Sequence, residues 1–432
     1  MSSAAFLPGN APPIGLGVDF GTTNSVVALA YEGGHVESLV FPSDLGASSN
    51  FRTALMFWRE GRKVCHAAGP DAIARAIAQE GEQRFIQSIK THLASPLFTE
   101  TRLYGERFTI EKLVATFLGH LFDHDSLRGA KPLSSRAGRP VVFAGERADE
   151  DLAVARLASA YAMAGLEGID LAYEPLGAAY YYARKLQRDE TVLVADFGGG
   201  TSDFSVLRFS REAGRLSAKP LGHGGVGVAG DSFDFRIVDH VVAPRLGKGT
   251  LYRSFGKLLP VPAYFHAAFA QWHQLSWLKS AHTLSELRKL AACAEEPDRL
   301  ADLIALIEHD LGFELYRSVG ALKAQLSDAD EARFVFKREG IDIDASVTRK
   351  EFETWIAGDL ERIGGAMDAT LKGARLAPED IDAVFVTGGT SYVPAVRKLF
   401  ATRFGEEKIH IGDAFQSVAS GLALMAADGA AA

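Results

Sequence analysis

Residues 192–207 read VLVADFGGGTSDFSVL, and residues 15–29 read GLGVDFGTTNSVVAL. Each stretch is an apolar run that favours a β-strand, then Asp-Phe-Gly, then a turn rich in glycine and threonine, then a second apolar run. The Asp-Phe-Gly units begin at Asp19 and Asp196. Each stretch predicts a strand–turn–strand hairpin. Two similar hairpins in the two halves of the chain indicate a duplicated domain with a cleft between the copies.

The two hairpins carry groups suited to the phosphates of a nucleotide. Glycine-rich turns let backbone N–H groups approach an anion closely. The hydroxyls of Thr22, Thr23 and Thr201 add further donors. Carboxylates such as Asp19 and Asp196 hold Mg²⁺ directly or through its waters. The pair of hairpins therefore predicts a magnesium–nucleotide site between the halves.

The composition is that of a folded protein. Of the 432 residues, 46 are basic and 54 acidic, which gives a net charge of −8, and 47% are hydrophobic. These values exclude a disordered chain, and two distant cysteines, Cys65 and Cys293, exclude a disulfide-stabilised miniprotein. The acidic balance argues against broad electrostatic binding of nucleic acid. Because no secretory signal and no run of about 18 apolar residues is present, we expect a cytoplasmic protein without membrane association.

Outside the two hairpins the pattern predicts mainly helices. The aromatic-rich segment 252–277 has two interpretations, a buried core or a protein-binding face. Helical spacing or start signals predict helices over 111–122, 149–164, 231–242 and 394–404, and one that begins at Glu174-Pro175. Apolar β-prone runs predict short strands at 140–143 and 383–387.

Five patches give a more specific indication. They are GVDFGTTNS at 17–25, IQSIKTHL at 86–93, YEPLGAAYYYA at 173–183, VADFGGGTSDFSVL at 194–207 and FVTGGTSYVPAVRKLF at 385–400. In this order they make the chain resemble the nucleotide-binding domain of the seventy-kilodalton heat-shock chaperones, within the actin-like ATPase superfamily. The resemblance extends over about residues 14–427, and the patch at 173–183 favours the chaperone branch.

The resemblance implies an α/β fold with two ribonuclease-H-like lobes around a central nucleotide cleft. Lobe I is expected over 14–190 with an inserted subdomain at about 41–129. Lobe II is expected over 191–427, with a mostly helical insertion at about 231–365 and a C-terminal helix at about 414–427 that returns to lobe I. Since only eleven residues follow Gly421, we expect the chain to lack the chaperones' peptide-binding domain and to act through a partner protein.

The resemblance also implies roles for individual residues, with ATP or ADP and Mg²⁺ as cofactors. Asp19 and Asp196 are expected to hold the magnesium and its waters. Lys90, Glu174, Asp203 and Thr201 are expected to act in hydrolysis. Lys90 is expected near the γ-phosphate and the attacking water, and Glu174 and Asp203 are expected to orient that water or to polarise the waters of magnesium. The nucleotide-binding set is Gly21, Thr22, Thr23, Gly198, Gly199, Gly200, Thr201, Gly230, Lys323, Ser327, Gly388, Gly389 and Thr390.

Three positions depart from the chaperone pattern around the base. Gly320, Ala324 and Tyr392 stand where charged residues are expected, so adenine should be held less selectively. The function expected is slow ATP hydrolysis coupled to lobe movement, as in a chaperone-like ATPase. Two alternatives stay open, namely a small-molecule kinase of the same superfamily and a nucleotide-bound scaffold or filament protein with little catalysis.

Overall fold

Both Asp-Phe-Gly stretches form antiparallel hairpins, each within its own mixed β-sheet. The structure is a computed structural model of the chain. It describes residues 12–42, 46–78, 83–127, 134–143, 148–184, 186, 188–212, 215–270, 278–411 and 417–429. Within these residues no helix is both long enough and apolar enough to cross a bilayer.

The first sheet is built on the hairpin of β1 (Gly15–Phe20) and β2 (Asn24–Ala30). β1 also pairs in parallel with β10 (Ser134–Arg139), and the strand order is β11-β10-β1-β2-β3, with β4 beside β2. The other strands are β3 (Val36–Ser38), β4 (Phe51–Arg52) and β11 (Asp170–Tyr173).

The second sheet repeats this plan around β12 (Glu190–Phe197) and β13 (Ser202–Glu212). β12 pairs in parallel with β19 (Ala383–Thr387), as β1 does with β10. The order is β14-β13-β12-β19-β20, with β14 at Arg215–Val226 and β20 at Ile409–Ile411. The duplicated sequence pattern therefore corresponds to a duplicated strand arrangement.

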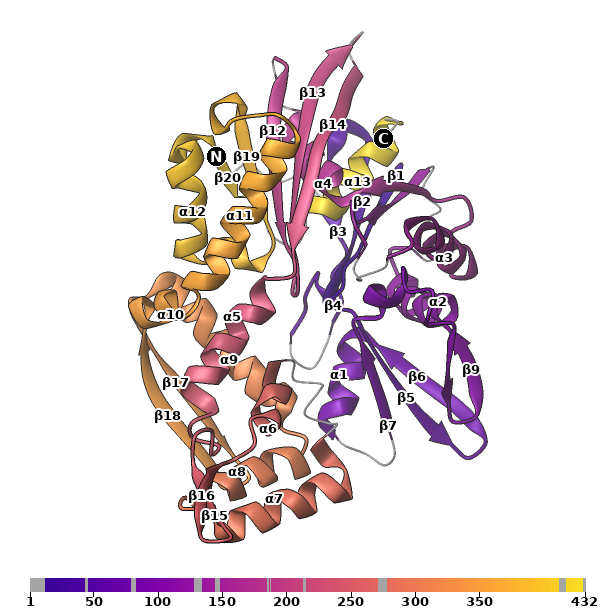
Figure 1. Cartoon of the computed structure of the whole chain (residues 1–432). Helices are drawn as coiled ribbons and strands as arrows, with labels where there is room; N and C mark the ends of the chain where they lie inside the picture. Colours follow the sequence, from indigo (N-terminus) through magenta and orange to yellow (C-terminus); the bar gives the residue numbers. More distant parts are fainter. Residues whose placement is uncertain are drawn as a thin grey trace, which may run out of the picture.

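Two helices, α4 (Glu174–Ala183) and α13 (Ser417–Asp428), pack against each other and share one apolar core with both hairpins. Figure 1 shows α13, in yellow, beside β1 and α4 although it ends the chain. The approach is close, since a Cβ placed on Gly17 would lie 2.0 Å from the carbonyl oxygen of Ala419. Glycine at this position therefore lets α13 lie directly on β1.

The opposite face of the first sheet is covered by α2 (Ile110–Phe122) and α3 (Glu150–Met163). Both helices confirm the sequence prediction. The side chain of Asp149 caps α3 by accepting from the backbone N–H of Leu152 at 2.9 Å. The neighbouring elements are η1 (Glu32–Gly34), β5 (Ala54–Glu60), β6 (Lys63–Ala68), α1 (Gly69–Ala78), β7 (Gln83–Gln87), η2 (Ile89–His92), β8 (Glu100–Leu103) and β9 (Glu106–Thr109).

The segment after β14 is mostly helical but also contains two β-hairpins. It begins with α5 (Gly230–Ile237), which continues into a π-helical turn, η3 (Val238–Val242), in agreement with the predicted helix. The hairpins are β15 (Leu251–Ser254) with β16 (Lys257–Pro260), and β17 (Glu331–Arg338) with β18 (Ile341–Thr348). The helices are α6 (Tyr264–Ala267), η4 (Ala268–Ala270), α7 (Ala281–Cys293), α8 (Pro297–Glu308), α9 (Gly312–Asp328), α10 (Arg349–Trp355) and α11 (Ala357–Gly373). The chain then adds η6 (Pro378–Asp380), η7 (Gly389–Tyr392), α12 (Pro394–Phe404) and η8 (Glu406–Lys408).

One strand prediction was wrong. Residues 140–143 were expected to form a strand, but β10 occupies 134–139 and ends before Pro140. Proline has no N–H to continue the ladder, so the strand stops there. The less apolar residues of β10 pair with β1 instead. Gly138, in this strand, lies close to Glu174, since a Cβ on Gly138 would be 2.8 Å from the Cγ of Glu174.

The aromatic segment divides between the two interpretations. Phe265 and Phe269 are fully buried in the core of this half, whereas Phe255 is fully exposed and Tyr264 is 48% exposed. Residues 271–277, which include two further aromatics, lie outside the described residues. The predicted C-terminal helix at 414–427 corresponds to α13, and its residues 414–416 also lie outside the described part.

Candidate functional site

The turns of the two hairpins lie against each other. A Cβ placed on Gly199, in the second turn, would lie 2.5 Å from the hydroxyl oxygen of Thr23 in the first. The carbonyl of Gly199 also accepts from the backbone N–H of Asp231 at 2.8 Å. The structure thus brings together segments 177 residues apart, as the duplication predicted.

The first turn, residues 21–23, is held from behind by Thr53. The hydroxyl of Thr53 donates to the carbonyl oxygen of Gly21 at 2.8 Å, and its backbone N–H donates to the carbonyl oxygen of Thr23 at 2.9 Å. Thr22 lies between them and is half-buried. The turn is therefore fixed by Thr53, and the Thr23 hydroxyl lies against Gly199 of the second turn.

The second turn, residues 198–201, closes on itself. The N–H of Gly198 donates to the carbonyl oxygen of Thr201 at 2.9 Å. The hydroxyl of Thr201 donates to Oδ2 of Asp203 at 2.9 Å. Gly198, Gly200 and Thr201 are exposed.

Four carboxylates gather near these turns. Asp19 and Asp196 lie near the ends of β1 and β12, Asp203 lies opposite Asp196 on β13, and Glu174 begins α4. Burial is the largest cause that raises the pKa of Asp19 to about 7, and the charge of Glu174 adds to it. Burial followed by Glu174 and Asp19 raises the pKa of Asp196 well above its usual range.

The pKa of Asp203 rises to about 6, again mainly because of burial. The hydrogen bond from Thr201 lowers this pKa, while the charge of Glu174 raises it. A carboxylate with a pKa near neutral is suited to accept a proton at physiological pH.

Lys90 is the cation that faces these carboxylates. It lies in η2 with a side chain 8% exposed, and its Nζ donates to Oε1 of Glu174 at 2.5 Å. Burial alone lowers the pKa of Lys90, but the charges of Glu174, Asp19 and Asp196 raise it, with the net effect upward. Lys90 is therefore held protonated within the site.

The carboxylates outnumber the cation, and this excess of negative charge suits a divalent cation. Within the described residues, however, no three His, Cys, Asp or Glu side chains converge closely enough to hold a metal ion by themselves. Carboxylate oxygens are ligands that Mg²⁺ prefers, so the chemistry of these residues fits the ion.

A second group of the predicted residues meets beside the glycine-rich turn. A Cβ on Gly230 would lie 3.0 Å from the hydroxyl oxygen of Thr390 and 3.5 Å from Nζ of Lys323. Nζ of Lys323 donates to the carbonyl oxygen of Gly230 at 3.3 Å and forms an ion pair with Asp234 at 2.8 Å. Residues from three separate elements, α5, α9 and η7, thus meet at this position.

The remaining predicted residues lie at the end of β19, in η7 and in α9. Gly388 has φ +89°, and a Cβ there would lie 2.0 Å from the carbonyl oxygen of Phe197, so glycine is required where β19 ends. Gly389 begins η7, which carries Thr390. Ser327 donates to the carbonyl oxygen of Lys323, one turn earlier in α9, at 3.2 Å.

The three positions that depart from the chaperone pattern are open to solvent. No described atom lies within 4 Å of a Cβ placed on Gly320, and Ala324 is exposed. Tyr392, at the end of η7, is 51% exposed.

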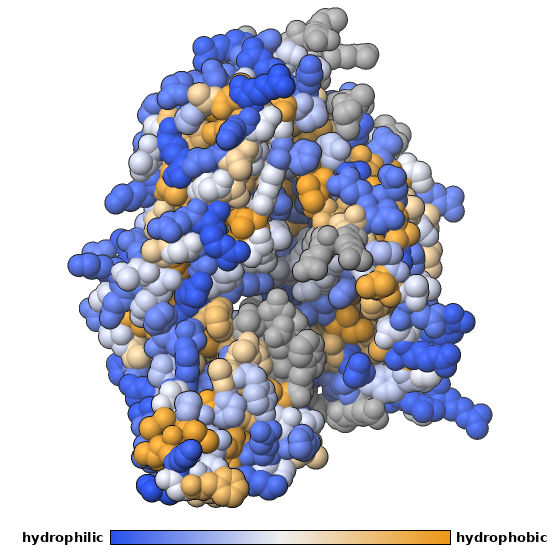
Figure 2. Space-filling model, viewed as in Figure 1, coloured by the Kyte–Doolittle hydropathy of each residue, from blue (hydrophilic) through white to orange (hydrophobic). Residues whose placement is uncertain are grey.

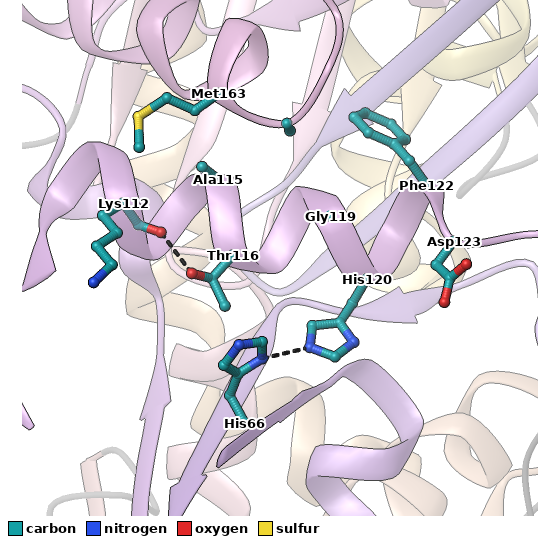
Figure 3. A pocket seen from close by; sticks show the side chains of 10 residues that line it. His66, Lys112, Ala115, Thr116, Gly119, His120, Phe122, Asp123 and Met163 are labelled. Carbon is teal, nitrogen blue, oxygen red and sulfur yellow. Dashed lines mark hydrogen bonds between the residues drawn. The ribbon is translucent and has the colours of Figure 1, made fainter. Parts of the chain in front are cut away.

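A separate groove of about 660 Å³ lies on α2, away from the hairpin turns (Figure 3). At its edge Nδ1 of His66 and Nε2 of His120 are 2.8 Å apart and share a hydrogen bond. His120 of α2 thus pairs with a histidine of β6. Figure 3 shows the two rings pointing toward each other from β6 and α2.

Sequence reasoning missed two groups that fix the site. Thr53 follows β4 and ties down the first turn, and Arg156 in α3 donates to backbone carbonyls just after Lys90. Both contacts join distant parts of the chain, so no local pattern announces them. The stretch VAGDSFD at 228–234 did contain a usable signal, because Asp231 and Asp234 are three residues apart on one helix.

Two sheets of the same plan, with facing Asp-Phe-Gly hairpins and two helices shared between them, define the mixed α/β fold of the actin-like ATPases. The family model described as "Hsp70 protein" matches residues 78–248 and 311–428, more than half of the chain. The protein belongs to the Hsp70 family, as its motifs predicted.

Proposed function

We propose that this chain binds and slowly hydrolyses magnesium–ATP between the two hairpins, with movement of two lobes, residues 14–190 and 191–427, coupled to the nucleotide. The observation that carries the proposal is the ion pair of Lys90 and Glu174, buried among carboxylates beside the facing turns. Membership of the Hsp70 family supports it, since ATP hydrolysis is general in that family.

In this proposal the residues act mainly by positioning and by charge. The turns at 21–23 and 198–201 cradle the phosphates with backbone N–H groups and threonine hydroxyls. Asp19 and Asp196 hold the waters of Mg²⁺, and bound Mg²⁺ neutralises the charge that develops on the phosphates. Lys90, kept protonated, approaches the γ-phosphate and the attacking water.

Glu174 and Asp203 orient that water. Asp203 is suited to receive its proton because its pKa of about 6 lies near physiological pH. On the other side of the turn, Gly230, Lys323, Ser327, Gly388, Gly389 and Thr390 surround the ribose and base.

The test is single-turnover hydrolysis of ATP. Asp196→Asn and Lys90→Ala should each slow hydrolysis by about 100-fold or more, the scale seen when one electrostatic group is removed from such a site. Lys90→Ala should retain ADP binding. The matched controls are Asp342→Asn and Lys337→Ala, which break an exposed ion pair of 3.0 Å in the β17–β18 hairpin. Rates of the site variants equal to wild type would refute the proposal.

The same assay distinguishes the alternatives. ATP consumption that requires an added sugar or other hydroxyl acceptor would indicate a kinase. Tight nucleotide binding without turnover would indicate a scaffold.

We further propose that a partner protein docks on the exposed apolar residues near the β15–β16 hairpin. These are Phe255, Leu258, Leu259 and Tyr264, between 39% and fully exposed. Figure 2 shows orange residues gathered at the lower end of the molecule, where Figure 1 places this hairpin. Exposed aromatics of this kind dominate interface hot spots. Capture of a partner from lysate with and without ATP, and its loss in Phe255→Ser, would support the surface. Unchanged capture would exclude it.

A further inference from the structure

Arg156, in α3, is a buried arginine directed at the segment that follows Lys90. Its Nη1 donates to the carbonyl oxygens of Leu93 and Ser95, each at 2.9 Å. Its Nη2 donates to the carbonyl oxygen of Phe98, also at 2.9 Å. The residue is 8% exposed, so these bonds are made away from competing water.

These carbonyls belong to a part of the chain with little regular structure. Residues 93–98 form turns between η2 and β8. Buried carbonyl groups in such turns need hydrogen-bond partners, and one guanidinium here serves three of them. A planar fork with five N–H donors is the side chain that can do this.

A short route of backbone bonds leads from Arg156 to Lys90. The N–H of Leu93 donates to the carbonyl oxygen of Lys90 at 3.2 Å, and the N–H of Ser95 donates to that of His92 at 3.2 Å. Arg156 therefore holds Leu93, whose N–H closes the turn that begins at Lys90, and Ser95, whose N–H closes the next turn.

The guanidinium itself is fixed from the other side. Its Nε lies 3.3 Å from Oε1 of Glu111 in α2. Because α2 and α3 pack together on the first sheet, this ion pair ties the guanidinium to a rigid pair of helices.

We infer that Arg156 is a positioning residue for Lys90. By holding the segment after Lys90, Arg156 keeps the Lys90 Nζ beside Glu174. It therefore affects the rate of hydrolysis and not the affinity for nucleotide. The inference rests on the proposed role of Lys90. A misplacement of about 1 Å in a reacting group costs on the order of 100-fold in rate.

The test is a double-mutant cycle on single-turnover ATP hydrolysis, with ADP affinity measured in parallel. Arg156→Ala should slow hydrolysis by about tenfold to 100-fold, with ADP affinity changed less than about twofold. Added to Lys90→Ala, it should cause no further loss, since residues that act through one another are not additive. The control is Arg299→Ala, which removes a comparable guanidinium–carbonyl bond to Pro244 (3.0 Å) in the other half of the chain and should leave the rate unchanged.

A readout that is independent of activity is hydrogen exchange. Amides of residues 89–98 should exchange faster in Arg156→Ala than in wild type, with little change elsewhere. Arg156→Lys keeps the charge but cannot reach three carbonyls. In Arg156→Lys the amides of 89–98 should also exchange faster, and the loss in hydrolysis rate should be intermediate between wild type and Arg156→Ala. If Arg156→Ala does not fold, Arg156→Lys takes its place in the test.

The inference would be overturned if the rate losses of Arg156→Ala and Lys90→Ala add in the double variant. It would also be overturned if the amides of 89–98 exchange at the wild-type rate in Arg156→Ala. If wild type does not hydrolyse ATP, the proposed function fails instead, and the exchange experiment still decides whether Arg156 fixes the segment that carries Lys90.

Discussion

The hydroxyl oxygen of Thr23 lies where a side chain on Gly199 would have to go. A Cβ on Gly199 would be 2.5 Å from this oxygen and 3.1 Å from Oδ2 of Asp231. The two residues come from different hairpins, so the contact measures how closely the two halves of the chain approach at the proposed phosphate site.

Gly199→Ala should therefore weaken nucleotide binding. The added methyl group must displace the Thr23 hydroxyl and crowd Asp231, which separates the two turns and their phosphate donors. Because a threonine hydroxyl can rotate, we expect a moderate loss of about tenfold in ADP affinity, measured by calorimetry, with little effect on thermal stability.

The matched variant is Gly200→Ala, since no described atom lies within 4 Å of a Cβ at that position. Its effect on affinity should be clearly smaller. Equal losses in both variants would show that glycine flexibility, and not the Thr23 contact, is what the turn needs.

The sequence predicted the hairpins and most helices because each is encoded locally. The alternating apolar runs beside Asp19 and Asp196 and the helical spacing of 111–122 need no knowledge of distant residues. The pairing of the two hairpins followed from their similarity, and the Hsp70 family match supports the same conclusion.

Features that depend on distant contacts were not predictable. The strand expected at 140–143 is displaced because β10 pairs through less apolar residues that leave room for Glu174. The fork of Arg156 onto carbonyls 58 to 63 residues away has no sequence signature. The pairing of His66 with His120 likewise joins a strand to a helix 54 residues later.

Asp196→Asn should stabilise the protein in the absence of nucleotide at alkaline pH. Burial raises the pKa of Asp196, so the folded state holds a proton that the unfolded chain has released above about pH 4. The free energy of unfolding contributed by this group therefore falls as pH rises. The variant removes the charge, and its Tm at pH 8 should exceed that of wild type by about 1–3 °C.

The gain should shrink at pH 5, where the wild-type carboxyl retains more of its protons. The exposed Asp342→Asn serves as control at both pH values. A lower Tm of Asp196→Asn at pH 8 would mean that the ionised carboxylate is well satisfied without a bound cation.

The His66–His120 pair should make the protein less stable in mild acid. Burial lowers the pKa of both rings, and the charge of Lys63 lowers that of His66 further while His66 lowers that of His120. Below about pH 6.5 the unfolded chain binds protons that the folded pair resists, so the free energy of unfolding falls as pH falls.

Neighbouring carboxylates moderate this trend, whereas Lys112 strengthens it. Glu106 raises the pKa of His66 while Lys112 lowers it, and Asp71 and Asp123 raise that of His120. In His66→Phe the loss of stability between pH 7 and pH 5, followed by urea unfolding, should be smaller than in wild type, although solvent screening reduces the difference because His66 is exposed. His282→Asn, at an exposed histidine of α7, should keep the wild-type slope. A His66→Phe slope equal to wild type would mean that the pair does not titrate on unfolding.

The open surface around Gly320, Ala324 and Tyr392 predicts weak selection among purine bases. Lys323, which lies between Gly320 and Ala324 in α9, is already paired with Asp234 at 2.8 Å. Affinities for ATP and GTP, measured by calorimetry, should differ by less than about tenfold, since at most one or two hydrogen bonds distinguish the bases here. Sub-micromolar binding of ATP with strong rejection of GTP would show that other residues supply the contacts.

Phe255 occupies a position for which its side chain is poorly suited. Ser254 pairs with Lys257 across β15 and β16, so Phe255 and Gly256 form a two-residue turn, with φ +44° and +75°. Such turns favour Asn-Gly, and a bulky residue with positive φ is strained. Its ring is also fully exposed.

Phe255→Asn should therefore stabilise the fold by about 0.5–1 kcal/mol, seen as a higher urea midpoint with an unchanged slope. Phe255→Ala separates the two causes, because it removes the exposed ring but keeps a residue disfavoured at positive φ, and should gain less. If the asparagine variant is more stable yet no longer captures the proposed partner, the phenylalanine is maintained for binding against the preference of the turn. If Phe255→Asn is less stable than wild type, the phenylalanine ring stabilises the hairpin, and the preference of the turn for asparagine does not decide the stability.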